Sequence, residues 1–97
     1  MKNELVLIVN ETINKDTLNN IIDNIKTLIT NEKGEIIEIC DLGVRKFPFP
    51  IQKLERGQYF DIIFKSDYKF IEILDKKLKN NENLIKYLIV DDIQDDL

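Results

Sequence analysis

The chain has 97 residues, 18 acidic against 14 basic ones, no histidine and one cysteine, for a net charge of −4. That length makes one domain and is short for an enzyme with an enclosed site. The lack of histidine removes the commonest general base and metal ligand, and the single Cys40 cannot form an internal disulfide. No apolar run reaches the roughly 20 residues that span a bilayer, and Glu4 interrupts any signal-peptide pattern. We therefore expect an intracellular protein with no catalytic residue, metal or cofactor.

The first half of the chain predicts a strand, a helix and a second strand. Residues 4–10 are a short apolar run bounded by polar residues, which is typical of a buried strand. Asn14 is a candidate N-cap for a helix that ends near Gly34. Its buried face is predicted from helical spacing and comprises Leu18, Ile21, Ile22, Ile25, Leu28 and Ile29. Residues 35–47 begin as a strand whose broken alternation predicts a bulge near Ile37 or Glu38.

The second half repeats this order. Residues 57–65 alternate, with one face predicted from Phe60, Ile62 and Phe64 and the other from Tyr59, Asp61 and Ile63. Asp67 is a candidate N-cap for a second helix, with a buried stripe of Ile71, Leu74 and Leu78 and with Phe70 beside it. An asparagine-rich turn leads into a last strand over residues 84–90.

The order βαββαβ predicts an α+β, ferredoxin-like fold, in which two helices cover one face of a four-stranded antiparallel sheet. We expect one domain over residues 1–91 and an acidic tail over 92–97. The first and last strands are apolar on both faces, yet the helices cover only one. An open face is therefore predicted, with Val6, Ile8, Tyr59, Ile63 and Tyr87 on it. Contiguous apolar area of this kind marks an interface, unless loops or the C-terminal segment cover it.

Residues 41–53 hold both prolines and a local excess of positive charge. Pro48 and Pro50 hold Phe47 and Phe49 in extended backbone, and residues 44–58 carry four cations, Arg45, Lys46, Lys53 and Arg56, against Glu55 alone. Displayed aromatics between cations suit a partner with phosphates and stackable bases. The net charge argues against nucleic acid, but four aspartates among the last seven residues account for all of it.

This segment also resembles a known family. Leu42-Gly43-x-Arg45-Lys46-Phe47-x-Phe49-Pro50-Ile51 is similar to the Leu-Gly-x-Arg-x-Leu-Ala-Tyr-Pro-Ile pattern of the S-six family, the sixth protein of the bacterial small ribosomal subunit. The similarity continues through Gly57-x-Tyr59 and through residues 78–90, and it includes the opening four residues. The chain departs from the family at Asn3, Pro48 and Phe49, where members usually have an aromatic, a small residue and a tyrosine.

The resemblance implies a ribosomal protein without catalytic activity, in the cytoplasm or an organelle matrix. It would bind the central domain of small-subunit ribosomal RNA as a heterodimer with the basic S-eighteen protein. Contacts to phosphates would come from Lys2, Arg45, Lys46, Lys53, Arg56 and Lys86. Contacts to the protein partner would come from the open face and its surroundings, namely Val6, Ile8, Phe49, Tyr59, Ile63 and Tyr87.

One alternative belongs to a different class. A ferredoxin-like regulatory domain would self-associate through the open face and bind a small metabolite, and its basic segment would be incidental. That alternative predicts a symmetric homodimer, whereas the ribosomal one predicts co-purification with ribosomes.

Overall fold

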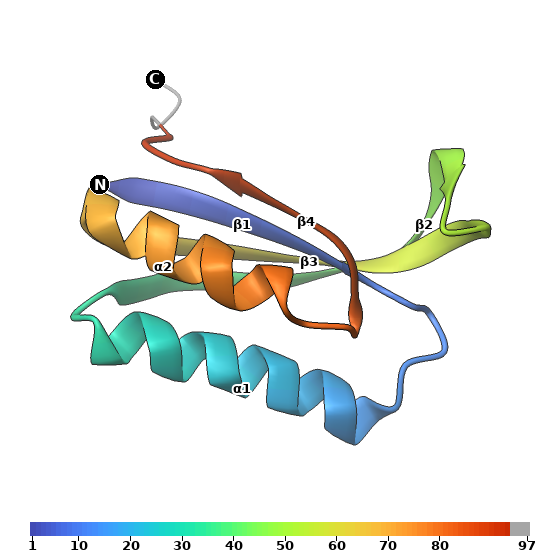
Figure 1. The fold of residues 1–97 in the computed structure, drawn as a ribbon, viewed down its shortest axis with the longest axis horizontal. Helices are drawn as coiled ribbons and strands as arrows, with labels where there is room; N and C mark the ends of the chain where they lie inside the picture. Colours follow the sequence, from blue (N-terminus) through green and yellow to red (C-terminus); the bar gives the residue numbers. More distant parts are fainter. Residues whose placement is uncertain (94–97) are drawn as a thin grey trace.

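The computed structural model describes residues 1–93 and confirms the predicted element order. The elements are β1 (Lys2–Val9), α1 (Lys15–Asn31), β2 (Glu35–Ile51), β3 (Leu54–Lys65), α2 (Tyr68–Lys79) and β4 (Leu84–Val90). The strands form one antiparallel sheet in the order β2-β3-β1-β4, with both helices on one side of it (Figure 1). This is the ferredoxin-like arrangement that the sequence predicts.

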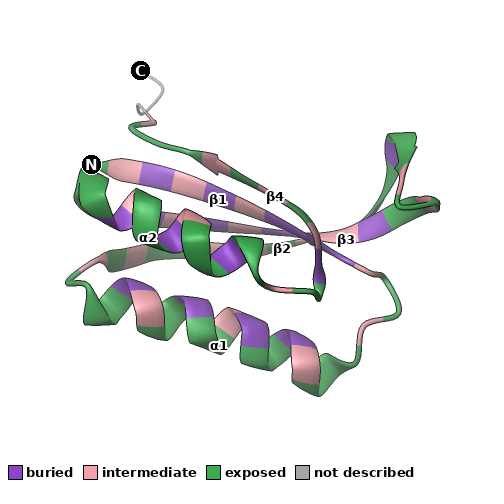
Figure 2. Ribbon diagram, viewed as in Figure 1, coloured by how far each residue is buried: buried purple, intermediate pink, exposed green. Residues whose placement is uncertain are grey.

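Each helix begins at the predicted cap and buries one face. The Asn14 side chain accepts a hydrogen bond from the Asp16 N–H at 2.8 Å, and Asp67 accepts one from the Phe70 N–H at 3.0 Å. Buried positions recur along one side of each helix (Figure 2). Phe70 was expected beside the stripe of α2, but it is 1% exposed and meets Phe64 edge-on, with ring centroids 5.9 Å apart. Ile71 is only half-buried.

The core lies between the helices and one face of the sheet. β1 contributes Leu5, Leu7 and Val9, and β3 contributes Phe60, Ile62 and Phe64, as its alternation predicts. Leu5 pairs with Ile62 and Leu7 with Phe60 across the two strands, and the helices pack their buried faces over these residues.

Tyr87 corrects the prediction for the last strand. It lies opposite Leu7 on the helix-covered face, and its hydroxyl donates to Asp75 Oδ1 on α2 at 2.7 Å. Burial and then the Asp75 carboxylate raise the pKa of Tyr87 to about 12, while this hydrogen bond lowers the pKa of Asp75. The register slips where Val9 pairs with Leu84 and Ile8 pairs with Lys86. One extra residue between Leu84 and Lys86 reverses the alternation along β4. From that point on, the residues of β4 that face away from the helices are Lys86, Leu88 and Val90.

The connection from α1 to β2 depends on a close backbone approach. The helix ends at Asn31, Lys33 takes the left-handed conformation at φ 63°, and the Gly34 N–H donates to the Ile29 carbonyl at 2.8 Å. A Cβ on Gly34 would lie 2.8 Å from the Ile29 carbonyl oxygen and 2.9 Å from that of Lys65. Glycine is thus needed here for space. The bulge predicted in β2 is confirmed by a register shift between Ile36 and Glu38.

β2 and β3 are longer than predicted and form a projecting hairpin. β2 continues past Phe47 to Ile51, and β3 already begins at Leu54. Gln52 and Lys53 make the turn with positive φ values of 51° and 65°. The pairing is irregular between Lys46 and Ile51, where two prolines lack the N–H that a ladder needs. The end of this hairpin extends beyond both helices (Figure 1).

The two ends of the described chain are tied together at Asn3. This residue is fully buried, its Nδ2 donates to Ser66 Oγ at 3.0 Å, and its Oδ1 accepts from the Asp92 N–H at 3.0 Å. The Ile93 N–H also donates to the Lys2 carbonyl at 2.8 Å. The predicted acidic tail therefore starts with two residues held against β1, and its remainder, residues 94–97, lies outside the described residues.

Candidate nucleic-acid and protein interface

Four of the predicted phosphate-binding cations lie together on the β2–β3 hairpin. Lys46 stands directly opposite Arg56, whereas Arg45 stands opposite Gly57 and so points to the other side. Lys53 occupies the turn. The nearest ion pair is a long one, from Arg56 Nε to Glu11 Oε1 at 3.8 Å. The hairpin thus presents cations on both of its sides.

Phe47 corrects the prediction that two aromatics are displayed. It is 5% exposed, and its ring centroid lies 6.2 Å from that of Tyr59. A Cβ on Gly57 would lie 2.8 Å from Phe47 Cζ and 2.9 Å from Ile8 Cγ2, so the ring occupies the space that a glycine leaves free. Phe49, two residues later, is 80% exposed. Of these two aromatic side chains, therefore, Phe49 is the one that a partner can contact.

Arg45 also packs against Tyr59, the residue that Phe47 contacts. Its guanidinium carbon lies 5.9 Å from the Tyr59 ring centroid, within the range of a cation–π contact, and its Nε donates to the Leu42 carbonyl at 3.4 Å. The guanidinium is held at the boundary between the hairpin and the sheet, where it can reach a ligand on either.

The open face is the side of the sheet that the helices do not cover. Cross-strand pairing places its residues in three rows: Lys86–Ile8–Tyr59–Gly43, Leu88–Val6–Asp61–Cys40 and Val90–Glu4–Ile63–Glu38. Leu88 is 55% exposed and Val90 is 37% exposed, while Val6, Tyr59 and Ile63 are half-buried. Ile8 is buried beside Phe47, so the chain itself covers this corner of the face. Phe47 and Arg45 also lie against Tyr59, whereas Leu88 and Val90 remain exposed among residues 1–93.

Three carboxylates lie in the two rows farther from the hairpin. Burial, a hydrogen bond with Glu4 and the charges of Glu4 and Glu38 raise the pKa of Asp61 to about 6. Asp61 Oδ1 is buried and has no hydrogen-bond partner. The Cys40 thiol donates to Glu38 Oε1 at 3.1 Å, and this bond, with burial and the neighbouring carboxylates, raises the pKa of Cys40. The sequence placed Asp61 on the same face as Tyr59 and Ile63, but neither the three acids nor Leu88 was predicted as a site residue. The alternation of side chains on both sides of Asp61 and of Lys86 would have placed them on the open face.

The two remaining cations lie at opposite ends of the sheet. Lys86 stands opposite Ile8 in the row nearest the hairpin, on the open face. Lys2 stands opposite Lys65 at the far end. At about 3.3 Å per residue, Lys2 is on the order of 20 Å from Ile8 along β1. The structure therefore brings Lys86 toward the hairpin and leaves Lys2 apart from it.

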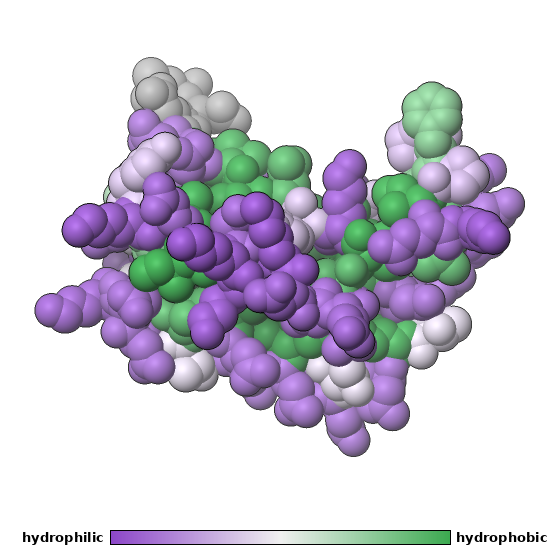
Figure 3. Space-filling view, viewed as in Figure 1, coloured by the Kyte–Doolittle hydropathy of each residue, from purple (hydrophilic) through white to green (hydrophobic). Residues whose placement is uncertain are grey.

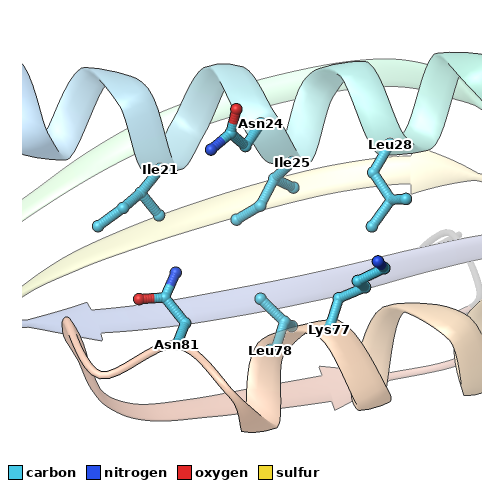
Figure 4. A pocket seen from close by; sticks show the side chains of 7 residues that line it. All are labelled: Ile21, Asn24, Ile25, Leu28, Lys77, Leu78 and Asn81. Carbon is cyan, nitrogen blue, oxygen red and sulfur yellow. The ribbon is translucent and has the colours of Figure 1, made fainter.

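A groove runs between the helices on the opposite side of the molecule. Ile21, Ile25 and Leu28 of α1 face Leu78 of α2 across it (Figure 4), and its volume is about 320 Å³. Its remaining lining residues are Asn24, Lys77 and Asn81. Hydrophilic side chains dominate the surface over the helices, with hydrophobic ones visible between them and on the hairpin (Figure 3). No helix among the described residues is long and apolar enough to cross a membrane, and within residues 1–93 no group of three or more acidic or cysteine side chains is arranged to hold a metal ion.

A sheet covered on one side only, with an apolar open face and a cationic hairpin at its end, is typical of a small module that binds other macromolecules. The family model described as "Ribosomal protein S6" matches residues 2–91. The chain therefore belongs to this family of small-subunit ribosomal proteins, which is the S-six family that its sequence resembles.

Individual relatives agree with this assignment. The small ribosomal subunit protein bS6 of Campylobacter hominis is 37% identical over 87 residues, covering 90% of this chain and 60% of that protein. The bS6 protein of Campylobacter jejuni is 33% identical over 87 residues, covering 90% of this chain and 70% of that protein. This chain thus spans about two thirds of the length of these relatives. The 30S ribosomal protein S6 from Thermotoga maritima superposes with a TM-score of 0.84 at 23% identity, over 92% of this chain and 84% of that one, which shows the shared fold.

Proposed function

We propose that this chain is a structural, non-catalytic protein of the small ribosomal subunit that binds the central domain of its ribosomal RNA together with the S-eighteen protein. The observation that carries the proposal is the projecting hairpin, where Arg45, Lys46, Lys53 and Arg56 meet only one acidic residue of the same segment, Glu55. Membership of the S-six family supports it.

In this proposal the hairpin contacts phosphates. Lys46 and Arg56 form an adjacent pair of cations on one side, and Arg45 with Lys86 approaches the RNA from the other. Such contacts release condensed counterions and fix the position of the protein on the RNA without reading its sequence. Lys2, at the far end of the sheet, would meet a separate stretch of phosphates.

The open face takes the protein partner. Val6, Tyr59 and Ile63 form its half-buried floor, Leu88 and Val90 add exposed apolar area, and Phe49 extends from the hairpin. Ile8 supports this floor from beneath Phe47. We leave Tyr87 out because its hydroxyl is bound to α2. A basic partner supplies counterion release that a chain of net charge −4 cannot, so the pair binds RNA more tightly than this chain alone.

The double variant Lys46→Ala, Arg56→Ala tests the RNA contacts. Two lost phosphate contacts lower the slope of log K against log salt by about 1.5. At ~0.1 M salt this corresponds to roughly 30-fold weaker binding. Filter binding of a central-domain RNA fragment by the complex with the S-eighteen protein, repeated across salt concentrations, gives both quantities. Lys26→Ala, a charge loss on an exposed position of α1, is the matched control for one cation.

Two outcomes would contradict the proposal. An unchanged salt slope in the double variant would mean that the hairpin cations touch no phosphate. A chain that forms a symmetric dimer and shows no affinity for the S-eighteen protein or the RNA would instead favour the regulatory-domain alternative.

A further inference from the structure

The open face carries an unusual charge pattern for an apolar interface. Its two rows farther from the hairpin hold Val6, Ile63, Leu88 and Val90, yet they also hold Glu4, Glu38 and Asp61 and no cation. Within residues 1–93 no ion pair involves any of these three carboxylates. Unpaired acids amid apolar surface disfavour an interface unless the partner compensates them.

Asp61 is the central member of this set. It lies on β3, one of the two central strands of the sheet, between Val6 on β1 and Cys40 on β2. Its Oδ1 is shielded from water and accepts no hydrogen bond. A buried acceptor without a partner costs about 1–3 kcal/mol, which a donor brought by a docking molecule recovers.

We propose that an arginine or lysine side chain of the protein partner sits over Asp61, Glu4 and Glu38, while apolar residues of the same segment cover Leu88, Val90, Val6 and Ile63. This inference rests on the proposed function and names the chemistry by which the open face selects its partner. The two molecules would be complementary in charge, since these rows of the face hold three carboxylates and no cation. Arginine suits the site best because its planar fork satisfies two carboxylates at once.

Other occupants of the face fit less well. A second copy of this chain, with its two-fold axis passing through these rows, would bring the two sets of carboxylates together, and like charges at an interface are repulsive. RNA phosphates would meet the same repulsion at Asp61, whereas the hairpin cations lie elsewhere. A basic protein segment is the occupant that satisfies both the apolar and the acidic residues.

Docking of a cation also changes the protonation of the site. The charged and titratable groups on this face around Asp61 are Glu4 on β1, Glu38 and Cys40 on β2, and, one row away, Tyr59 on its own strand and Lys86 on β4. Lys2 and Lys65 lie one row beyond Glu4 and Ile63. Because the carboxyl of Asp61 holds a proton up to a pH of about 6, an arriving cation displaces that proton. Binding therefore weakens as the pH falls below this value.

Calorimetry with the S-eighteen protein of the same organism tests this inference. At pH 6, titrations in two buffers with different ionisation enthalpies are expected to reveal release of roughly half a proton per complex, and at pH 8 none. Asp61→Asn keeps the shape of the side chain but removes its charge. We expect it to weaken the complex at least tenfold and to abolish the proton release. Glu38→Gln should weaken it by a smaller factor, and Glu72→Gln, on the exposed side of α2, is the matched control with less than a twofold change.

The possible results distinguish this inference from self-association and from a failure of the proposed function. If Asp61→Asn and Glu38→Gln bind the partner as tightly as the unaltered chain, with no proton release at pH 6, the inference is overturned while the proposed partnership stands. Self-association that is lost in Leu88→Ser would also overturn it, in favour of a second copy. No binding of the S-eighteen protein by the unaltered chain would overturn the proposed function and this inference together.

Discussion

Replacing Phe47 with alanine tests whether one aromatic ring fastens the projecting hairpin to the sheet. Phe47 and Phe49 make a matched pair, since each precedes a proline on the same strand. They differ in burial, at 5% and 80% exposed. If stability follows burial, the two alanine variants will separate widely.

The structure sets the size of the difference. Fully burying a phenylalanine side chain contributes about 1.5–3 kcal/mol, and removing it leaves a cavity, so Phe→Ala in a core costs about 3–5 kcal/mol. Phe47 lies beside Ile8, Gly57 and Tyr59, outside the main hydrophobic core, which places its loss near the lower end, at about 3 kcal/mol. Phe49→Ala should change the free energy of unfolding by no more than about 0.5 kcal/mol.

Urea titration followed by far-ultraviolet circular dichroism measures both variants, because the chain has no tryptophan to report on folding. For a domain of this size, about 3 kcal/mol corresponds to a fall in Tm of more than about 12 °C. A loss below about 1 kcal/mol in Phe47→Ala, or equal losses in the two variants, would refute the assignment of Phe47 as the fastening residue.

Three further predictions follow from single contacts. Asn3→Ala leaves Ser66 Oγ without its donor and the Asp92 N–H without its acceptor, and it should cost about 2–3 kcal/mol. Faster amide exchange at Asp92 checks this prediction, and unchanged protection there would contradict it. Gly34→Ala should cost about 3 kcal/mol because the added Cβ meets two backbone oxygens. Gly43→Ala should cost about 1 kcal/mol, because its Cβ would meet no atom within 4 Å and only the positive φ of 80° is unfavourable. Thermal melts in which Gly43→Ala loses more stability than Gly34→Ala would contradict this prediction. The raised pKa of Asp61 means that the folded state keeps a proton that the unfolded state releases between about pH 4 and pH 6, so stability falls as the pH rises through this window. Asp61→Asn should flatten that decline and be about 1 kcal/mol more stable at pH 7 after allowance for solvent screening; parallel stability–pH curves in urea titrations would contradict it.

The fold could be predicted because its signals are local and periodic. The caps Asn14 and Asp67 and the alternation of β3 each need only a few neighbouring residues to be recognised. The prediction of which residues of the last strand face the helices was wrong, for a different reason. Six of its seven residues are apolar, so the pattern gives no period, and the bulge beside Leu84 reverses which side each faces. Lys86 was the available indication, since a charged residue on a half-covered sheet points away from the core.

The candidate site was predicted only in part. The closeness of the hairpin cations in the sequence predicted that they lie together, but it could not show that Arg45 and Lys46 point to opposite sides. Nor could it show that Phe47 is buried, because the space for its ring is provided by Gly57, ten residues away across the hairpin. Such contacts depend on strand register, which sequence patterns fix poorly where prolines interrupt a strand. The role of each phosphate-binding and partner-binding residue stays a prediction.

The separation of charge within the chain explains why its net charge misleads. Arg56 on the hairpin and Asp61 on the open face are five residues apart on β3, which is about 16 Å at the rise of a strand. The Debye length at physiological salt is about 8 Å, so charges on the surface at this distance scarcely affect each other. The hairpin can therefore attract phosphates although the open face is acidic, and the open face can attract a basic segment although the hairpin is cationic. A chain placed between an anionic and a cationic partner gains from such a division, whereas a net charge of −4 sums the charges of the whole chain and does not show where they lie.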